Sequence, residues 1–125
     1  MNNILYQKYA PHLLRLGLVF VLAWFGSSQL FDPAPWTGLI PLWITNMGIS
    51  ATAFVYLNGS VEIVLAILLV FNIATRLVSL LVALHLLTIV FDVGLTGVGV
   101  RDIGLMVMAL ASAALGSGKE EVSTI

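Results

Sequence analysis

Residues 51–71, with the sequence ATAFVYLNGSVEIVLAILLVF, decide how the rest of the chain is interpreted. The stretch is long enough to cross a bilayer, because about 20 helical residues at 1.5 Å each span the ~30 Å of hydrocarbon. Glu62 is its only charged residue. A carboxylate at that depth costs at least about 2.5 kcal/mol unless it is paired, hydrated or protonated. Glu62 is therefore a candidate for a functional residue.

The composition is that of a membrane protein. Hydrophobic residues make up 60% of the 125 residues and charged residues only 9%, whereas soluble domains have about 25% charged residues. The formal net charge of −1 gives no indication of a nucleic-acid partner. The chain has no Cys, which excludes thiol–disulfide chemistry and Cys-ligated clusters within it. Its length predicts one transmembrane domain over residues 1–125.

Four apolar runs predict four membrane spans, at about residues 13–31, 51–71, 75–93 and 102–115. The runs are continuous rather than alternating, and backbone groups in lipid must be paired within the protein, so helices are expected. The sequence thus predicts an all-α four-transmembrane-helix bundle. Residues 72–74 form a tight link between the second and third spans. Gly94, Gly97 and Gly99 are expected to break the chain before a short fourth span.

The segment between the first two spans has a different character. It is apolar and aromatic, but Pro33, Pro35 and Pro41 interrupt it, and proline removes a backbone donor. Trp36 and Trp43 are of a type that favours the membrane–water interface. We expect a Trp/Pro-rich interfacial or re-entrant loop, with a short helix near residues 36–46, that acts as a lid over one end of the bundle.

Basic residues predict the orientation of the chain. With the N-terminus inside, four basic residues lie on the cytoplasmic side and only Arg101 lies outside; the four are Lys8, Arg15, Arg76 and Lys119. Short cytoplasmic loops carry an excess of Lys and Arg. The prediction is an N-in, C-in protein with the Trp/Pro-rich loop outside.

Counting residues from the tight link places Glu62 and His85 at one depth. Each lies eleven or twelve residues from the link on its own helix, or about 17 Å at 1.5 Å per residue. A contact between them is therefore expected. Asn58 precedes Glu62 by one helical turn, and His85, Thr88 and Asp92 form one stripe.

These positions predict a buried polar site around Glu62. Its expected members are Arg15, Gln29, Asn58, Glu62, His85, Asp92 and Arg101. Glu62 is either a proton-exchanging or ligand-binding carboxylate or a residue that fixes helix packing. His85 is either a packed residue or a hydrogen-bond and proton-relay partner.

The charged residues at the ends of the spans leave further alternatives. Arg15 is either a surface anchor or a counter-ion for Glu62. Arg101 and Asp102 are expected to cap the fourth helix, with Arg101 also able to pair with Asp92. The two histidines, His12 and His85, differ in depth, so no metal site is predicted.

The chain resembles the DoxX family of small four-span bacterial and archaeal membrane proteins. The matching features are Arg15-Leu16-Gly17, Gly26-Ser27-Ser28-Gln29-Leu30, the Trp/Pro loop, Gly59-Ser60-Val61-Glu62, Arg76 and Arg101-Asp102. The family often has Lys where this chain has Gln29. The resemblance implies a four-helix membrane bundle in a prokaryotic cytoplasmic membrane. It also implies a link to quinone-coupled redox chemistry, because some relatives are subunits of thiosulfate:quinone oxidoreductase.

The sequence and the resemblance favour two functions. The first is a quinone- or lipophile-binding subunit of a membrane redox system, with no covalently bound cofactor. This chain has no cofactor motif of its own, so electrons would come from a membrane or soluble redox partner. The second is a non-catalytic scaffold or assembly factor for a partner complex, a role that the resemblance implies through more distant relatives. A proton-coupled transporter is less favoured, because four spans give little room for alternating access without a homo-oligomer.

Overall fold

The computed structural model describes residues 3–117, and within them every regular element is helical. Four helices are long and apolar enough to cross a membrane: α1 (Asn3–Phe31), α3 (Ala51–Val70), α4 (Thr75–Val93) and α5 (Gly97–Leu115). A 3₁₀ helix, η1 (Ala34–Leu39), and the short α2 (Leu42–Asn46) lie between α1 and α3. The predicted all-α fold with four membrane-spanning helices is confirmed.

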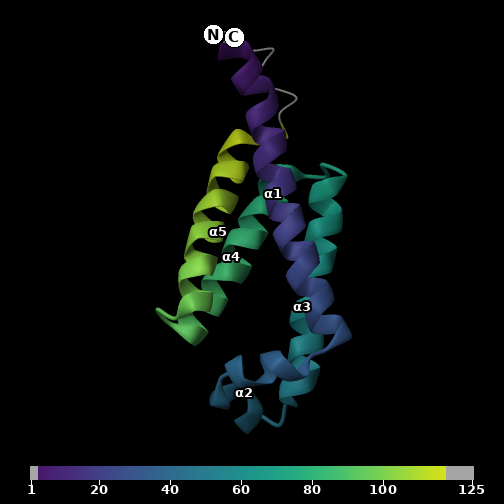
Figure 1. The fold of residues 1–125 in the computed structure, drawn as a ribbon, viewed down its shortest axis with the longest axis vertical. Helices are drawn as coiled ribbons and strands as arrows, with labels where there is room; N and C mark the ends of the chain where they lie inside the picture. The colour runs from purple at the N-terminus through teal and green to yellow at the C-terminus, as the bar shows by residue number, and fades with distance from the viewer. Residues whose placement is uncertain (1–2, 118–125) are drawn as a thin grey trace.

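The four long helices form two closely packed pairs. Helix α1 packs mainly on α3, and α4 packs mainly on α5. The start of α1 and the end of α5 lie toward one end of the molecule, and η1 and α2 lie at the other (Figure 1). Apolar side chains from all four helices fill the centre: Leu18, Leu22, Leu65, Ala66, Leu69, Val78, Val82, Ala83, Leu86 and Ala109. Several of these are Ala or Val, which lets the backbones approach closely.

Helices α1 and α3 come into close contact at two glycines. A Cβ atom built on Gly59 would lie 2.9 Å from the carbonyl oxygen of Gly26 and 3.0 Å from Cβ of Gln29. A Cβ on Gly26 would in turn lie 3.0 Å from the carbonyl oxygen of Gly59. Only glycine fits at these two positions without displacing the opposite backbone. Small residues of this kind are typical of helix interfaces in membranes.

Helix α1 begins ten residues before the predicted start of the first span. The span was predicted to start at about residue 13, whereas the helix includes Pro11 and extends back to Asn3. Proline removes one backbone hydrogen bond, but a membrane helix can continue through it. With 29 residues, α1 rises about 43 Å at 1.5 Å per residue. Its first turns therefore extend past the other helices (Figure 1).

Helix α5 also begins earlier than predicted, at Gly97 rather than at residue 102. Of Gly94, Gly97 and Gly99, only Gly94 ends a helix, with a φ of 66° that favours glycine. The hydroxyl of Thr96 accepts a hydrogen bond from the amide of Gly99 and starts α5. A Cβ on Gly99 would lie 1.7 Å from the carbonyl oxygen of Gly94. These glycines make a tight corner rather than a long break, so α5 has 19 residues.

The Trp/Pro-rich segment contains two short helices instead of the one expected near residues 36–46. Ile40 and Pro41 separate η1 from α2. The ring of Trp36 packs edge-on against Phe25 of α1, with centroids 5.7 Å apart. This contact holds η1 against the end of the bundle. The depth of the segment in a membrane stays a prediction.

Replacing Gly59 with alanine tests the glycine contact. The new methyl would collide with the Gly26 carbonyl oxygen, so Gly59→Ala is expected to lower stability by about 1–3 kcal/mol. Gly104→Ala is the matched control, because no atom lies within 4 Å of a Cβ built there. It should be neutral or stabilising by up to about 1 kcal/mol. Thermal unfolding in detergent measures both, and an equal Tm for the two variants would contradict the contact.

Candidate functional site

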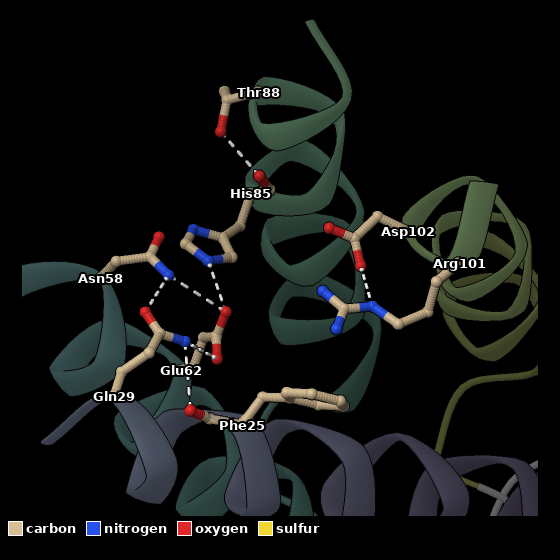
Figure 2. Close-up of polar contacts among 8 residues, drawn as sticks. All are labelled: Phe25, Gln29, Asn58, Glu62, His85, Thr88, Arg101 and Asp102. Carbon is tan, nitrogen blue, oxygen red and sulfur yellow. Dashed lines mark hydrogen bonds and ion pairs between the residues drawn. The ribbon is translucent and has the colours of Figure 1, made fainter. Parts of the chain in front are cut away.

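Four polar side chains from three helices meet around Glu62. Gln29 comes from α1, Asn58 and Glu62 from α3, and His85 from α4 (Figure 2). The Glu62 side chain is buried, with a relative exposure of 5% for the residue. The Gln29 amide donates to Oε2 of Glu62 at 3.1 Å, and the Asn58 amide donates to Oε1 at 3.2 Å. We call these four residues the Glu62 cluster.

Gln29 holds the cluster together. Its side-chain nitrogen donates to Glu62 and to the carbonyl oxygen of Phe25 at 3.1 Å, while its side-chain oxygen accepts a 2.7 Å bond from Asn58. Both donor and acceptor of this buried amide are thus satisfied. Because Gln29 and Glu62 lie on different helices, the bond between them fixes the rotation of α1 against α3.

His85 completes the cluster from α4. Its Nε2 lies 3.4 Å from Oε1 of Glu62, at the contact that equal depth predicted. When Glu62 is ionised, the imidazole donates from Nε2; when Glu62 is protonated, the acid can donate to a neutral Nε2. The pair can therefore hold one proton in either of two places. The Thr88 hydroxyl instead donates to the carbonyl oxygen of His85, and Thr88 is exposed, so the expected stripe does not continue through it.

An outer cavity of about 60 Å³ opens beside the Glu62 cluster. Its polar lining consists of Gln29, Asn58, Glu62, Asp92 and Arg101. Aromatic and aliphatic side chains form the rest, among them Trp36, Phe54, Ile89 and Val93. Residues of η1 and the following turn, including Leu39 and Pro41, cover its outer end. The cavity thus combines apolar walls with a small number of converging polar groups, as ligand sites do.

Arg101 supplies the positive charge near this cavity. Its Nε donates to Oδ1 of Asp102 at 2.9 Å, and its guanidinium lies 4.2 Å from the ring centroid of Phe25. Arg101 pairs with Asp102 rather than with Asp92, although Asp92 lines the same cavity. The cation–π contact anchors the arginine against α1. The guanidinium tip points from α5 toward the cluster (Figure 2).

Arg15 lies away from the site, so the alternative that made it a counter-ion for Glu62 is wrong. Its guanidinium donates to the carbonyl oxygen of Leu69 at 2.8 Å and contacts Nδ1 of His12 at 2.8 Å. Leu69 is seven residues beyond Glu62 on α3, or about 10 Å farther along the helix. Arg15 therefore satisfies a backbone carbonyl near the C-terminal end of α3, where a positive charge is favourable.

Asp102 was missed as a site residue. It was expected to cap the last helix, but α5 starts at Gly97, which places Asp102 in the second turn with a fully buried side chain. The spacing of Thr96 and Gly99 was the signal for the true start, because a Thr N-cap bonds the amide three residues later. With that start, Asp102 turns into the bundle beside Phe25 and Leu105.

Four membrane-crossing helices around a buried polar cluster define a small α-helical integral membrane protein. The chain belongs to the DoxX family, since the DoxX family model matches residues 10–95. The matched range includes all four members of the Glu62 cluster and ends before α5, so Arg101 and Asp102 lie beyond it. Searches of curated proteins and of solved structures found no match.

Removing the Gln29 amide tests whether the cluster stabilises the fold. Gln29→Leu would leave Asn58 and Oε2 of Glu62 short of a partner, so a loss of about 1–3 kcal/mol is expected. Ser60→Ala is the control, because the exposed Ser60 hydroxyl bonds only the Tyr56 carbonyl of its own helix. Denaturant unfolding in mixed micelles compares the two. A Gln29→Leu protein as stable as Ser60→Ala would show that the cluster contributes nothing to stability.

Proposed function

We propose that this DoxX protein binds a quinone, or a lipophile with a similar carbonyl-bearing ring, in the outer cavity. It would act as a membrane subunit of a redox system whose electrons come from a partner protein. The observation that supports this most directly is the lining of the cavity. Trp36 and Phe54 offer flat apolar surfaces, while Asn58 and Arg101 offer donors to a ring carbonyl.

The size of the cavity sets a condition on binding. An engineered cavity of roughly 150 Å³ holds benzene, whereas the outer cavity measures about 60 Å³. A quinone ring therefore enters only if part of the wall moves. The segment around Trp36 and Pro41 is the part that can, because it is held to the bundle mainly by the Phe25–Trp36 contact and by packing on α3. In this proposal, the lid expected from the sequence would move to admit the quinone ring.

The Glu62 cluster supports a role in proton exchange at the same place. Reduction of a quinone to a quinol takes up two electrons and two protons. Glu62 lines the outer cavity and contacts His85, so a proton carried by this pair would be within reach of a ring oxygen that replaces the Asn58 or Gln29 contact. The chain's own residues would thus bind and orient the ring and deliver one of the two protons. The partner would supply both electrons, and water would supply the second proton.

Fluorescence quenching tests quinone binding. In a protein with Trp24→Phe and Trp43→Phe, the only tryptophan is Trp36, which lines the cavity. A short-chain ubiquinone or menaquinone in nanodiscs should quench this protein saturably, and Arg101→Gln should weaken binding by about tenfold, the equivalent of ~1.4 kcal/mol for one lost charged hydrogen bond.

The control keeps Trp24, which lies on the exposed face of α1, as the only tryptophan. It should show only linear quenching from quinone dissolved in the lipid. Equal, unsaturable quenching of both proteins, together with no quinone in lipid extracts of the purified protein, would reject the proposal. The scaffold or assembly role would then be the function to test, by asking whether deletion disrupts a partner complex.

We further infer that both termini face the cytoplasm. The start of α1 and the end of α5 lie toward the same end of the molecule (Figure 1). Lys8 and Arg15 lie in the first half of α1, and Arg76, in the first turn of α4, donates to carbonyl oxygens at the end of α5. Arg101 lies near the start of α5, at the opposite end of that helix, and an excess of basic residues marks the cytoplasmic side. Lys119, the fourth basic residue of this prediction, lies outside the described residues.

Cysteine labelling tests this orientation, because the natural chain has no cysteine. Gly38→Cys in η1 and Ile73→Cys in the α3–α4 turn each introduce a single thiol at an exposed position. The two positions lie at opposite ends of α3. In intact cells, a membrane-impermeant maleimide should label Gly38→Cys and leave Ile73→Cys unlabelled until the cells are opened. The reverse pattern would show that the termini lie outside.

A further inference from the structure

Asp102 has a carboxylate oxygen for which the helix packing provides no partner. The side chain is fully buried, and Oδ1 accepts the bond from Nε of Arg101. Oδ2 is the one buried side-chain oxygen or nitrogen without a hydrogen bond among residues 3–117. Buried polar atoms nearly always have a partner in the protein or an ordered water, so this oxygen requires an explanation.

Asp102 lines a small inner cavity. Its volume is about 10 Å³, which is close to the roughly 10–15 Å³ that one water molecule needs. Its polar lining residues are Glu62, Arg101 and Asp102, and the others are aliphatic or aromatic. In Figure 2 the free oxygen of Asp102 and the guanidinium of Arg101 both point from α5 toward the side on which Glu62 lies. Three polar groups are enough to hold a buried water.

We propose that one water molecule in the inner cavity joins Glu62 to Asp102, and that the two acids share a single proton through it. The transfer is balanced. Protonated Glu62 gives its proton to the water oxygen while the water gives another proton to Oδ2 of Asp102. The water is unchanged, Glu62 becomes a carboxylate and Asp102 becomes an acid. This exchange lies inside the protein and holds whether or not a quinone binds in the outer cavity.

The charges around the two acids favour one shared proton. Arg101 is always charged and can balance one carboxylate, and a second unbalanced carboxylate between membrane helices would be costly. From α1 the cluster receives only the neutral Gln29, and from α4 it receives His85, which contacts Glu62. Asp92, also on α4, lines the outer cavity with Glu62 but does not line the inner one. Within residues 3–117, only Glu62 lines both cavities and also contacts His85.

Infrared spectroscopy of the full chain in nanodiscs tests the shared proton. The wild type should show the carbonyl stretch of one protonated carboxylic acid at neutral pH. Glu62→Gln and Asp102→Asn should each abolish this band, because the acid that remains is then balanced by Arg101 and ionises. Two independent acids would lose the band in one variant only. Asp32→Asn, at the exposed end of α1, should leave the band unchanged.

Two infrared results would contradict the shared proton. A wild type with no protonated carboxyl, or a band that survives either substitution, would mean that the two acids do not share a proton.

A second pair of variants examines the water without changing either acid, in case the charge variants do not fold. Val82→Ile adds one methylene to the lining of the inner cavity, and Val64→Ile adds the same group on an exposed face of α3.

The water itself is followed by its O–H stretch, which shifts when ¹⁸O-labelled water replaces ordinary water. A narrow band of this kind is expected in the wild type and in Val64→Ile, and it should be lost in Val82→Ile. If the wild type has no such band, or if Val82→Ile keeps it, the water-linked pair is rejected.

Discussion

The backbone contact between Gly26 and Gly59 is the constraint on which the polar site depends. Because neither residue carries a Cβ, α1 and α3 come close enough for Gln29 to lie across Gly59. Asn58 and Glu62 stand on either side of that glycine along α3, and the side chain of Gln29 bonds both. A wider spacing between the helices would separate the amide from the carboxylate. The polar contacts of the site therefore depend on the close packing of α1 and α3.

The Glu62 cluster in turn gives the bundle a specific arrangement. In a membrane, apolar side chains gain little by leaving lipid for the protein interior, so apolar contacts alone define helix rotation weakly. A buried carboxylate instead requires donors at defined positions. Gln29 supplies one from α1 and His85 supplies another from α4. Rotating α1 or α4 would remove one of the donors to Glu62, and this ties the three helices to one orientation.

Sequence reasoning predicted the parts of this structure that depend on distance along the chain. The second and third spans are joined by a short turn whose position is clear from the sequence. Counting residues from that turn along each helix therefore predicted the Glu62–His85 contact. Sequence reasoning did not give the helix starts, because α1 begins at Asn3 and α5 begins at Gly97, both before the predicted starts of their spans. It also could not decide which arginine would lie near Glu62, because that depends on helix starts and rotations. Arg101 takes that position through its contacts with Phe25 and Asp102.

Glu62 lines both the outer and the inner cavity, so its side chain connects the two. A group that enters the outer cavity competes for the donors that hold the Glu62 carboxylate. If the two acids share a proton as proposed, loss of a donor to the Glu62 carboxylate would leave that proton on Glu62 rather than on Asp102. The state of Asp102 would then follow events in the outer cavity, although Asp102 does not line it. Arg101, which lines both cavities, remains the fixed charge against which either acid is balanced.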